Sequence, residues 1–120
     1  TNDLTARQPA SDTLANLESM LDIRDRGAPT AHVVLCTVPP SANPQAPVDP
    51  HQLQVLNAGL RQLASRREGV SLVDLFAATA TASGTPDLQW FKPDRLHLSD
   101  AGYERWKTAL VPVFREHGLL

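Results

Sequence analysis

The sequence of 120 residues predicts an open α/β fold, in which a parallel sheet is covered by helices on both faces. The expected elements alternate in the order helix, strand, helix, strand, helix, which is typical of parallel strands joined by right-handed crossovers. Both strand segments are apolar at almost every position, as strands buried on two faces are. Two such strands alone would leave apolar surface and backbone groups exposed. We therefore expect further strands, from preceding sequence or from another chain, to complete the sheet.

The first helix is expected over residues 11–26 and the first strand over residues 32–38. Leu14, Leu17 and Leu21 recur at the spacing of three and four residues that places side chains on one helix face. The strand segment reads HVVLCTV, a run in which β-branched residues dominate. The two segments together predict a helix that leads into a buried strand.

The second helix has the clearest start signal in the sequence. Asp49 is placed as its N-cap, Pro50 as its first residue, and Gln52 where it would complete a capping box. Leucines then recur every three or four residues, and Gly69 follows the end of the pattern. The run 70–76, VSLVDLF, is the second expected strand.

The remaining segments are a proline-rich loop and two helices. Five of the ten prolines lie within residues 39–50, which predicts a long surface loop. Residues 77–82 are expected to form a short helix or turn. Ser99 is placed to cap the final helix, in which Tyr103 and Trp106 begin an apolar stripe that we expect to face the core.

The composition excludes several classes of function. Eleven Lys and Arg against thirteen Asp and Glu give a net charge of −2, without a basic block on which nucleic-acid binding could depend. No apolar run approaches the roughly 20 residues of a transmembrane helix. The single cysteine, Cys36, excludes an internal disulfide and a cysteine-based zinc site. The histidines outside the segment discussed next, His32, His51 and His117, share no metal-ligand spacing, so no metal site is expected.

Asp94 and His97 are the first candidate catalytic pair. In a compact turn this spacing lets the carboxylate reach one ring nitrogen, fix the tautomer and stabilise the imidazolium, while the other nitrogen acts as a base. The alternative is structural, with an aspartate that caps a turn and a histidine that packs. For an isolated D-x-x-H the structural interpretation is the more common one.

The surrounding residues resemble a known family. Residues 94–103 read DRLHLSDAGY and resemble the last block of the SGNH hydrolases, also called GDSL-type esterases and lipases, which is D-x-x-H-x-x-x-x-G-[YH]. Residues 1–3, TND, resemble the tail of the family's G-x-N-D block, and residues 33–40 resemble the segment between the two blocks. The resemblance implies a three-layer α/β/α, flavodoxin-like fold. Residues 1–120 would be the C-terminal part of that single domain.

The resemblance also implies a role for each matching residue. Asn2 would donate its side-chain amide to the oxyanion of a tetrahedral intermediate. His97 would act as general base and then as general acid, and Asp94 would orient it. The implied substrate is a small-molecule ester, a lipid or an acetylated glycan, with no metal or organic cofactor. Many members of the family are exported, so the resemblance slightly favours an extracytoplasmic or secreted location, and the sequence leaves the compartment open.

One part of the family's machinery is missing. The nucleophile of the family lies in a G-D-S block, and none of the seven serines here follows Gly-Asp. We therefore expect the serine in an N-terminal half that is truncated, carried by a second chain or lost, and we expect residues 1–120 alone to be inactive. Two alternatives remain open. One is a non-catalytic domain that binds a glycan or acyl ligand, and the other is a structural relic that packs on a partner chain.

Three residues beside the candidate pair have open roles. Trp90 and Phe91 precede it and would either form the wall of an acyl or sugar pocket or anchor the loop to the core. Arg95 lies between the two candidate residues, where it would either contact an anionic group or remain solvated.

Overall fold

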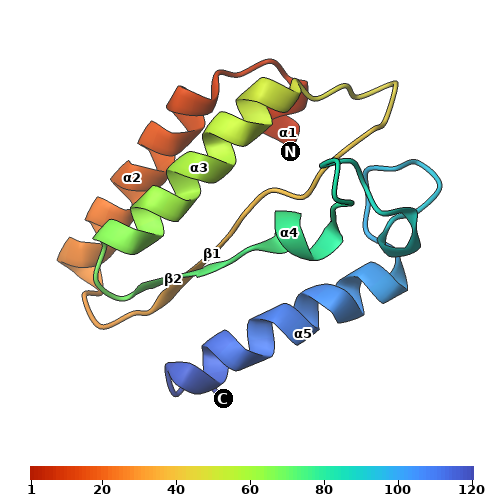
Figure 1. Ribbon diagram of the computed structural model, residues 1–120. Helices are drawn as coiled ribbons and strands as arrows, with labels where there is room; N and C mark the ends of the chain where they lie inside the picture. Colours follow the sequence, from red (N-terminus) through yellow and green to blue (C-terminus); the bar gives the residue numbers. More distant parts are fainter.

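A computed structural model describes residues 1–120 as a small parallel sheet between two layers of helices (Figure 1). Strands β1 and β2 pair in parallel, with Val33 opposite Val70. Helices α2 and α3 lie on one side of the strands and α5 on the other (Figure 1). The elements are α1 (Asn2–Thr5), α2 (Ala10–Gly27), β1 (Val33–Cys36), α3 (Pro50–Arg66), β2 (Val70–Val73), α4 (Leu75–Thr79), the 3₁₀ helix η1 (Leu88–Trp90) and α5 (Asp100–Glu116). The expected α/β class and its three layers are confirmed.

The core lies between α2, α3 and the sheet. Leu4, Leu53, Leu56 and Leu60 are its main buried side chains, and Leu35 and Leu72 of the strands pack against them. The apolar spacing seen in the sequence thus places α3 on the sheet with one leucine face. This cluster also fixes α1, since its only buried residue is Leu4.

The start of α3 differs in one detail from the expectation. Asp49 caps the helix by accepting a hydrogen bond from His51 N at 2.8 Å. Gln52 does not complete a capping box, and its Oε1 instead accepts from Ala10 N at 2.8 Å. A tertiary contact explains this difference: the first backbone N–H groups of α2 need acceptors, and the side chain of Gln52 lies close enough to supply one. This contact joins the beginnings of α2 and α3.

Both strands are shorter than the sequence indicated. β1 and β2 have four residues each, and β2 ends at Val73 although the apolar run continues to Phe76. Asp74 ends it by accepting a hydrogen bond from Ala77 N at 3.1 Å, which makes it the N-cap of α4. The short helix expected over 77–82 therefore begins two residues earlier, at Leu75. Helix α1 and η1 were not expected.

A hydrogen-bond network centred on the buried Thr37 ties the carboxyl ends of the two strands together. Thr37, which is 1% exposed, donates through Oγ1 to Asp74 Oδ1 at 2.8 Å and accepts from Phe76 N at 2.8 Å. Arg61 of α3 donates from Nε and from Nη2 to Asp74 Oδ2. Burial alone would raise the pKa of Asp74, but the hydrogen bonds from Ala77 N, Arg61 and Thr37 together outweigh burial and lower it. The network fixes the carboxyl end of the sheet, from which the loops after β1 and β2 begin.

The C-terminal end of helix α5 is attached to the amino end of the sheet through two histidines and Ser71. His32 Nε2 lies 2.8 Å from Ser71 Oγ, and His117 Nε2 lies 2.7 Å from the same oxygen. The two rings stack with centroids 4.1 Å apart. Burial and the proximity of His117 and Arg24 lower the pKa of His32. The predicted apolar stripe of α5 is less buried than expected, and Tyr103 is 54% exposed.

None of the helices has the length and apolar character required to cross a bilayer. The thiol of Cys36 is half-buried, and this burial raises its pKa. The residue is therefore a neutral thiol at neutral pH, consistent with a filler in the strand.

Candidate active site

Asp94 and His97 form a hydrogen-bonded pair in the loop between η1 and α5. The distance from Asp94 Oδ2 to His97 Nδ1 is 2.6 Å. The other carboxylate oxygen, Oδ1, accepts from the backbone N–H groups of Leu96 and His97, each at 3.0 Å. The side chain of His97 is 67% exposed, and its Nε2 has no hydrogen-bond partner among the 120 residues. The sequence spacing thus produces a pair with one free ring nitrogen.

These contacts determine the protonation of the pair. The hydrogen bond from His97 and the two backbone N–H bonds hold the pKa of Asp94 at about 2, well below its usual range. The carboxylate is therefore ionised at neutral pH and can only accept hydrogen bonds. Because it accepts from Nδ1, the proton of the neutral imidazole lies on Nδ1 and the lone pair lies on Nε2. This is the tautomer that a general base requires.

The backbone of the loop is closed by its own hydrogen bonds. Phe91 and Leu98 form an antiparallel bridge, and Lys92 N donates to His97 O at 2.8 Å. Arg95 N donates to Lys92 O at 2.9 Å, and Arg95 itself adopts a left-handed conformation with φ of 57°. Such a conformation is uncommon for a residue other than glycine and is found in tight turns. It reverses the chain between the two catalytic candidates.

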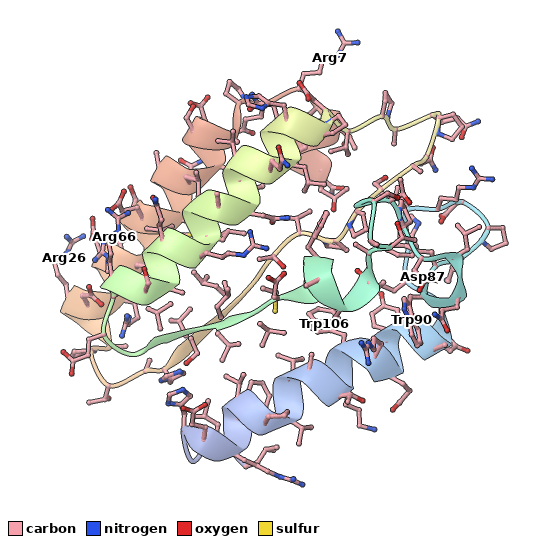
Figure 2. The ribbon with its side chains drawn as sticks, viewed as in Figure 1. Arg7, Arg26, Arg66, Asp87, Trp90 and Trp106 are labelled. Carbon is pink, nitrogen blue, oxygen red and sulfur yellow. The ribbon has the colours of Figure 1, made fainter.

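Close packing holds this loop against the beginning of α5. Ser99 caps α5 by accepting from Gly102 N at 3.2 Å, while its own N–H donates to Trp90 O at 3.0 Å. A Cβ atom on Gly102 would lie only 2.1 Å from Trp90 O. Trp90 and Asp87 lie beside the start of α5 in Figure 2. The glycine is therefore needed for the contact that positions the loop.

The two aromatic residues before the loop have structural roles. Phe91 is 6% exposed and anchors the loop to the core. Trp90 is half-buried, and the guanidinium of Arg105 lies 5.5 Å from the centre of its ring. Phe91 therefore anchors the loop, and it also lines a surface hollow beside Lys92 and Arg95.

Asn2 lies at the beginning of α1, exposed to solvent. Its backbone oxygen accepts from Ala6 N and from Thr5 Oγ1, whereas its side-chain amide has no hydrogen-bond partner. No hydrogen bond joins Asn2 to Asp94 or His97. The structure thus brings two of the three predicted site residues together, and the convergence of Asn2 with them stays a prediction.

The helix that carries Asn2 and the loop that carries His97 both contact the segment after β1. Leu4 of α1 lies in the cluster against which Val38 and Val48 pack, and Ala42 N donates to Arg95 O at 3.0 Å. In Figure 1 both segments lie toward the carboxyl ends of the strands. Open α/β sheets bind their ligands at this edge. The proline-rich loop is therefore the physical link between the two parts of the candidate site.

No serine of residues 1–120 forms a hydrogen bond with the side chain of His97. Ser99, the nearest in sequence, donates to Gln89 O and accepts from Gly102 N. Ser71 is bonded to histidines at the opposite, amino end of the strands. Residues 1–120 therefore contain the candidate base and its hydrogen-bonded carboxylate, and no serine hydroxyl is bonded to either of them.

Comparison with protein families gives a match over most of the chain. The model of the GDSL-like Lipase/Acylhydrolase family matches residues 1–105. The chain belongs to the GDSL-like lipase/acylhydrolase family. The resemblance read from the sequence is thereby confirmed, and the matched range includes Asn2, Asp94 and His97. Among curated proteins, none matches this GDSL-like chain.

Solved structures show the same fold. The GDSL-like chain is similar to a candidate platelet activating factor from Streptococcus pneumoniae, with a TM-score of 0.83, 24% identity and coverage of 93% of this chain and 55% of that one. A candidate acylhydrolase from Bacteroides fragilis gives a TM-score of 0.82 and 23% identity, covering 98% of this chain and 58% of that one. A GDSL-like lipase from Bacteroides thetaiotaomicron gives a TM-score of 0.80 and 18% identity, covering 98% of this chain and 60% of that one. The chain thus spans between 55% and 60% of the length of these proteins.

Sequence reasoning missed two features of the site. The sequence identified Gly102 only as the glycine of the family motif. A glycine is needed there because the backbone approaches Trp90 O closely, and this approach depends on how η1 packs on α5. The left-handed conformation of Arg95 could not be predicted from the sequence, because a glycine or an asparagine usually occupies such a position.

Proposed function

We propose that the complete protein is a carboxylic-ester hydrolase that works through a serine acyl-enzyme, with its serine outside residues 1–120. The observation that carries the proposal is the contact between Asp94 Oδ2 and His97 Nδ1, which leaves Nε2 of an exposed imidazole free. Membership of the GDSL-like family supports hydrolysis of esters as the reaction. Substrates of esterase, lipase and glycan deacetylase type all share that chemistry.

In the first half of the reaction, His97 Nε2 takes the proton of the serine hydroxyl as the oxygen attacks the ester carbonyl carbon. The resulting imidazolium is stabilised by the ionised Asp94, whose low pKa keeps it charged at the working pH. Asn2 donates its amide to the oxyanion, an interaction worth about 3–4 kcal/mol in similar sites. Collapse of the intermediate breaks the bond to the leaving alcohol, which takes the proton back from Nε2.

In the second half, a water molecule attacks the acyl-enzyme. His97 Nε2 accepts a proton from this water, and the second tetrahedral intermediate collapses to the carboxylic acid and the free serine, which recovers its proton from the imidazolium. The same nitrogen thus serves as base and acid in both halves. We further infer that residues 1–120 alone do not turn over ester, since no serine lies beside His97.

Hydrolysis of a short-chain nitrophenyl ester by the complete protein tests the proposal. We expect turnover that His97→Ala lowers by about 10²–10⁴-fold, the usual contribution of general acid–base catalysis. A matched control is His51→Ala, because His51 is an exposed histidine of α3 whose ring makes no hydrogen bond. Equal turnover of the wild type and the His97→Ala protein would refute the role of His97. A complete protein without turnover would instead favour a binding domain.

A further inference from the structure

The loop that carries the catalytic candidates also carries two cations that form no ion pair. Lys92 and Arg95 are exposed, neither lies within 4.0 Å of a carboxylate oxygen of residues 1–120, and neither side chain donates a hydrogen bond within these residues. Asp94 lies between them in the sequence and is ionised, so the three side chains together carry one net positive charge. The Asp94 carboxylate is bonded to His97 and to two backbone N–H groups. This positive charge lies on a chain whose net charge is −2. We propose that Lys92 and Arg95 bind a negatively charged oxygen group of the ester substrate.

The two cations border a surface hollow of suitable size. Its volume is about 350 Å³, and it is lined by Leu88, Phe91, Lys92, Pro93 and Arg95. Leu88 is 60% exposed, so the hollow combines apolar surface with two positive charges. Pockets for small ligands have volumes from about 300 Å³ upward and combine apolar walls with a few polar groups. This lining fits an ester with a short apolar chain that ends in a carboxylate or a phosphate.

Backbone hydrogen bonds fix the positions of residues 92 and 95 within the loop that carries the base. Lys92 N is bonded to His97 O, Arg95 N to Lys92 O, and Arg95 O accepts from Ala42 N. Arg95 adopts a left-handed conformation, and conformations of this kind cluster at ligand-binding sites. An anionic group held here would lie next to the loop that presents Nε2. The planar guanidinium is suited to a carboxylate or phosphate because it can donate two parallel hydrogen bonds.

This proposal rests on the proposed function, since it names the class of ester that the same site accepts. Two substrates that share the same leaving group distinguish ester hydrolysis itself from a preference for anionic esters. We compare the mono-4-nitrophenyl ester of glutaric acid, whose acyl chain ends in a carboxylate, with 4-nitrophenyl valerate, its neutral counterpart. The measured quantity is the ratio of kcat/KM for the anionic ester to kcat/KM for the neutral ester, in the complete protein.

The informative variants are Lys92→Gln, Arg95→Asn and the double variant. Asparagine is chosen because it tolerates a left-handed backbone. The matched control is Arg7→Asn, since Arg7 is another exposed arginine with a left-handed conformation, at φ of 59°, and without a salt bridge. Figure 2 shows Arg7 pointing away from the body of the protein.

We expect the ratio to fall about tenfold in the double variant and to stay at the wild-type value in Arg7→Asn, because charge-assisted hydrogen bonds to the anionic group are lost. Raising the ionic strength to about 1 M, where the Debye length is about 3 Å, is expected to lower the wild-type ratio and to leave that of the double variant unchanged. An unchanged ratio in the double variant, or an equal fall in Arg7→Asn, would overturn the proposal while ester hydrolysis still stands.

A binding measurement decides the matter if the protein hydrolyses neither ester, which would refute the proposed function. Valerate, pentyl phosphate and neutral valeramide are titrated while the backbone amide signals of Lys92 and Arg95 are followed by NMR. Saturable shifts with either anion that are absent with valeramide and in the double variant support the anion site. The anion with the lower dissociation constant shows whether the site prefers a carboxylate or a phosphate. Absence of saturable shifts with both anions would overturn the proposed anion site.

Discussion

Replacing Gly102 by alanine tests how the catalytic loop is positioned. The new Cβ would lie 2.1 Å from Trp90 O and 3.1 Å from both Cβ and Cδ2 of Leu98. Carbon atoms of this kind essentially never approach other atoms below 3.0 Å, so η1 and the beginning of α5 must separate by at least about 0.9 Å. The backbone oxygen cannot rotate away as a side chain could. The hydrogen bond from Ser99 N to Trp90 O, now 3.0 Å, is stretched by the same movement.

Two effects of this movement can be estimated. Overpacking of a well-packed site costs about 1–3 kcal/mol, and the Tm of the complete protein is expected to fall by at least about 2 °C. His97 belongs to the displaced loop, and a shift of about 1 Å at a catalytic group can lower the rate by about 100-fold. We therefore expect Gly102→Ala to lower both Tm and kcat/KM of the complete protein.

Thermal denaturation and ester hydrolysis measure the two effects. The control is Gly27→Ala at the end of α2, where a Cβ would have no atom within 4 Å. That change is expected to leave the stability unchanged or to raise it by up to about 1 kcal/mol, because alanine favours the helix. If Gly102→Ala matched Gly27→Ala in both Tm and kcat/KM, the argument that Gly102 positions the loop would be refuted.

Two further predictions concern charged groups. Asp94→Asn is expected to lower kcat/KM by about 10²–10⁴-fold, and by no more than His97→Ala does, with little change in Tm, because the wrong tautomer of His97 is favoured. In the wild type the Asp94 carboxyl should titrate with a pKa of about 2 by NMR, and this pKa should return toward 3.8 in His97→Gln. At the opposite end of the sheet, the lowered pKa of His32 means that the folded state binds fewer protons than the unfolded state near this pKa, so the stability contributed by this difference is present above pH 6.5 and is lost as the pH falls through the lowered pKa. The Tm should therefore decrease as the pH falls below 6.5, and less so in His117→Asn, whereas an equal decrease in both proteins would contradict the role of the stacked pair.

The sequence predicted those parts of the fold that depend on local patterns. Leucine spacing and the Asp49–Pro50 start signal located α3 to within one or two residues, because capping and apolar periodicity are local. The end of β2 was misplaced because Asp74 caps α4 and so interrupts an apolar run that suits a strand. Gln52 satisfied the capping-box pattern and yet bonds Ala10, a partner 42 residues away. Contacts between distant segments were outside the reach of local patterns.

The candidate site shows the same division. The contact between Asp94 and His97 followed from their spacing, since a three-residue turn brings the two side chains within hydrogen-bond distance. The close approach at Gly102 and the conformation of Arg95 depend on how η1, α5 and the loop after β1 meet. The predicted meeting of Asn2 with this pair depends on the same tertiary packing, and it remains to be tested.

The central claim is that Asp94 and His97 activate a serine of the complete protein. Reaction of the complete protein with a fluorophosphonate probe tests it most directly, since only an activated serine is labelled rapidly. We predict labelling of a single serine outside residues 1–120, roughly 10²–10⁴-fold slower in His97→Ala and unchanged in His51→Ala. Absence of labelling in the wild type, or labelling of His97→Ala at the wild-type rate, would contradict the claim.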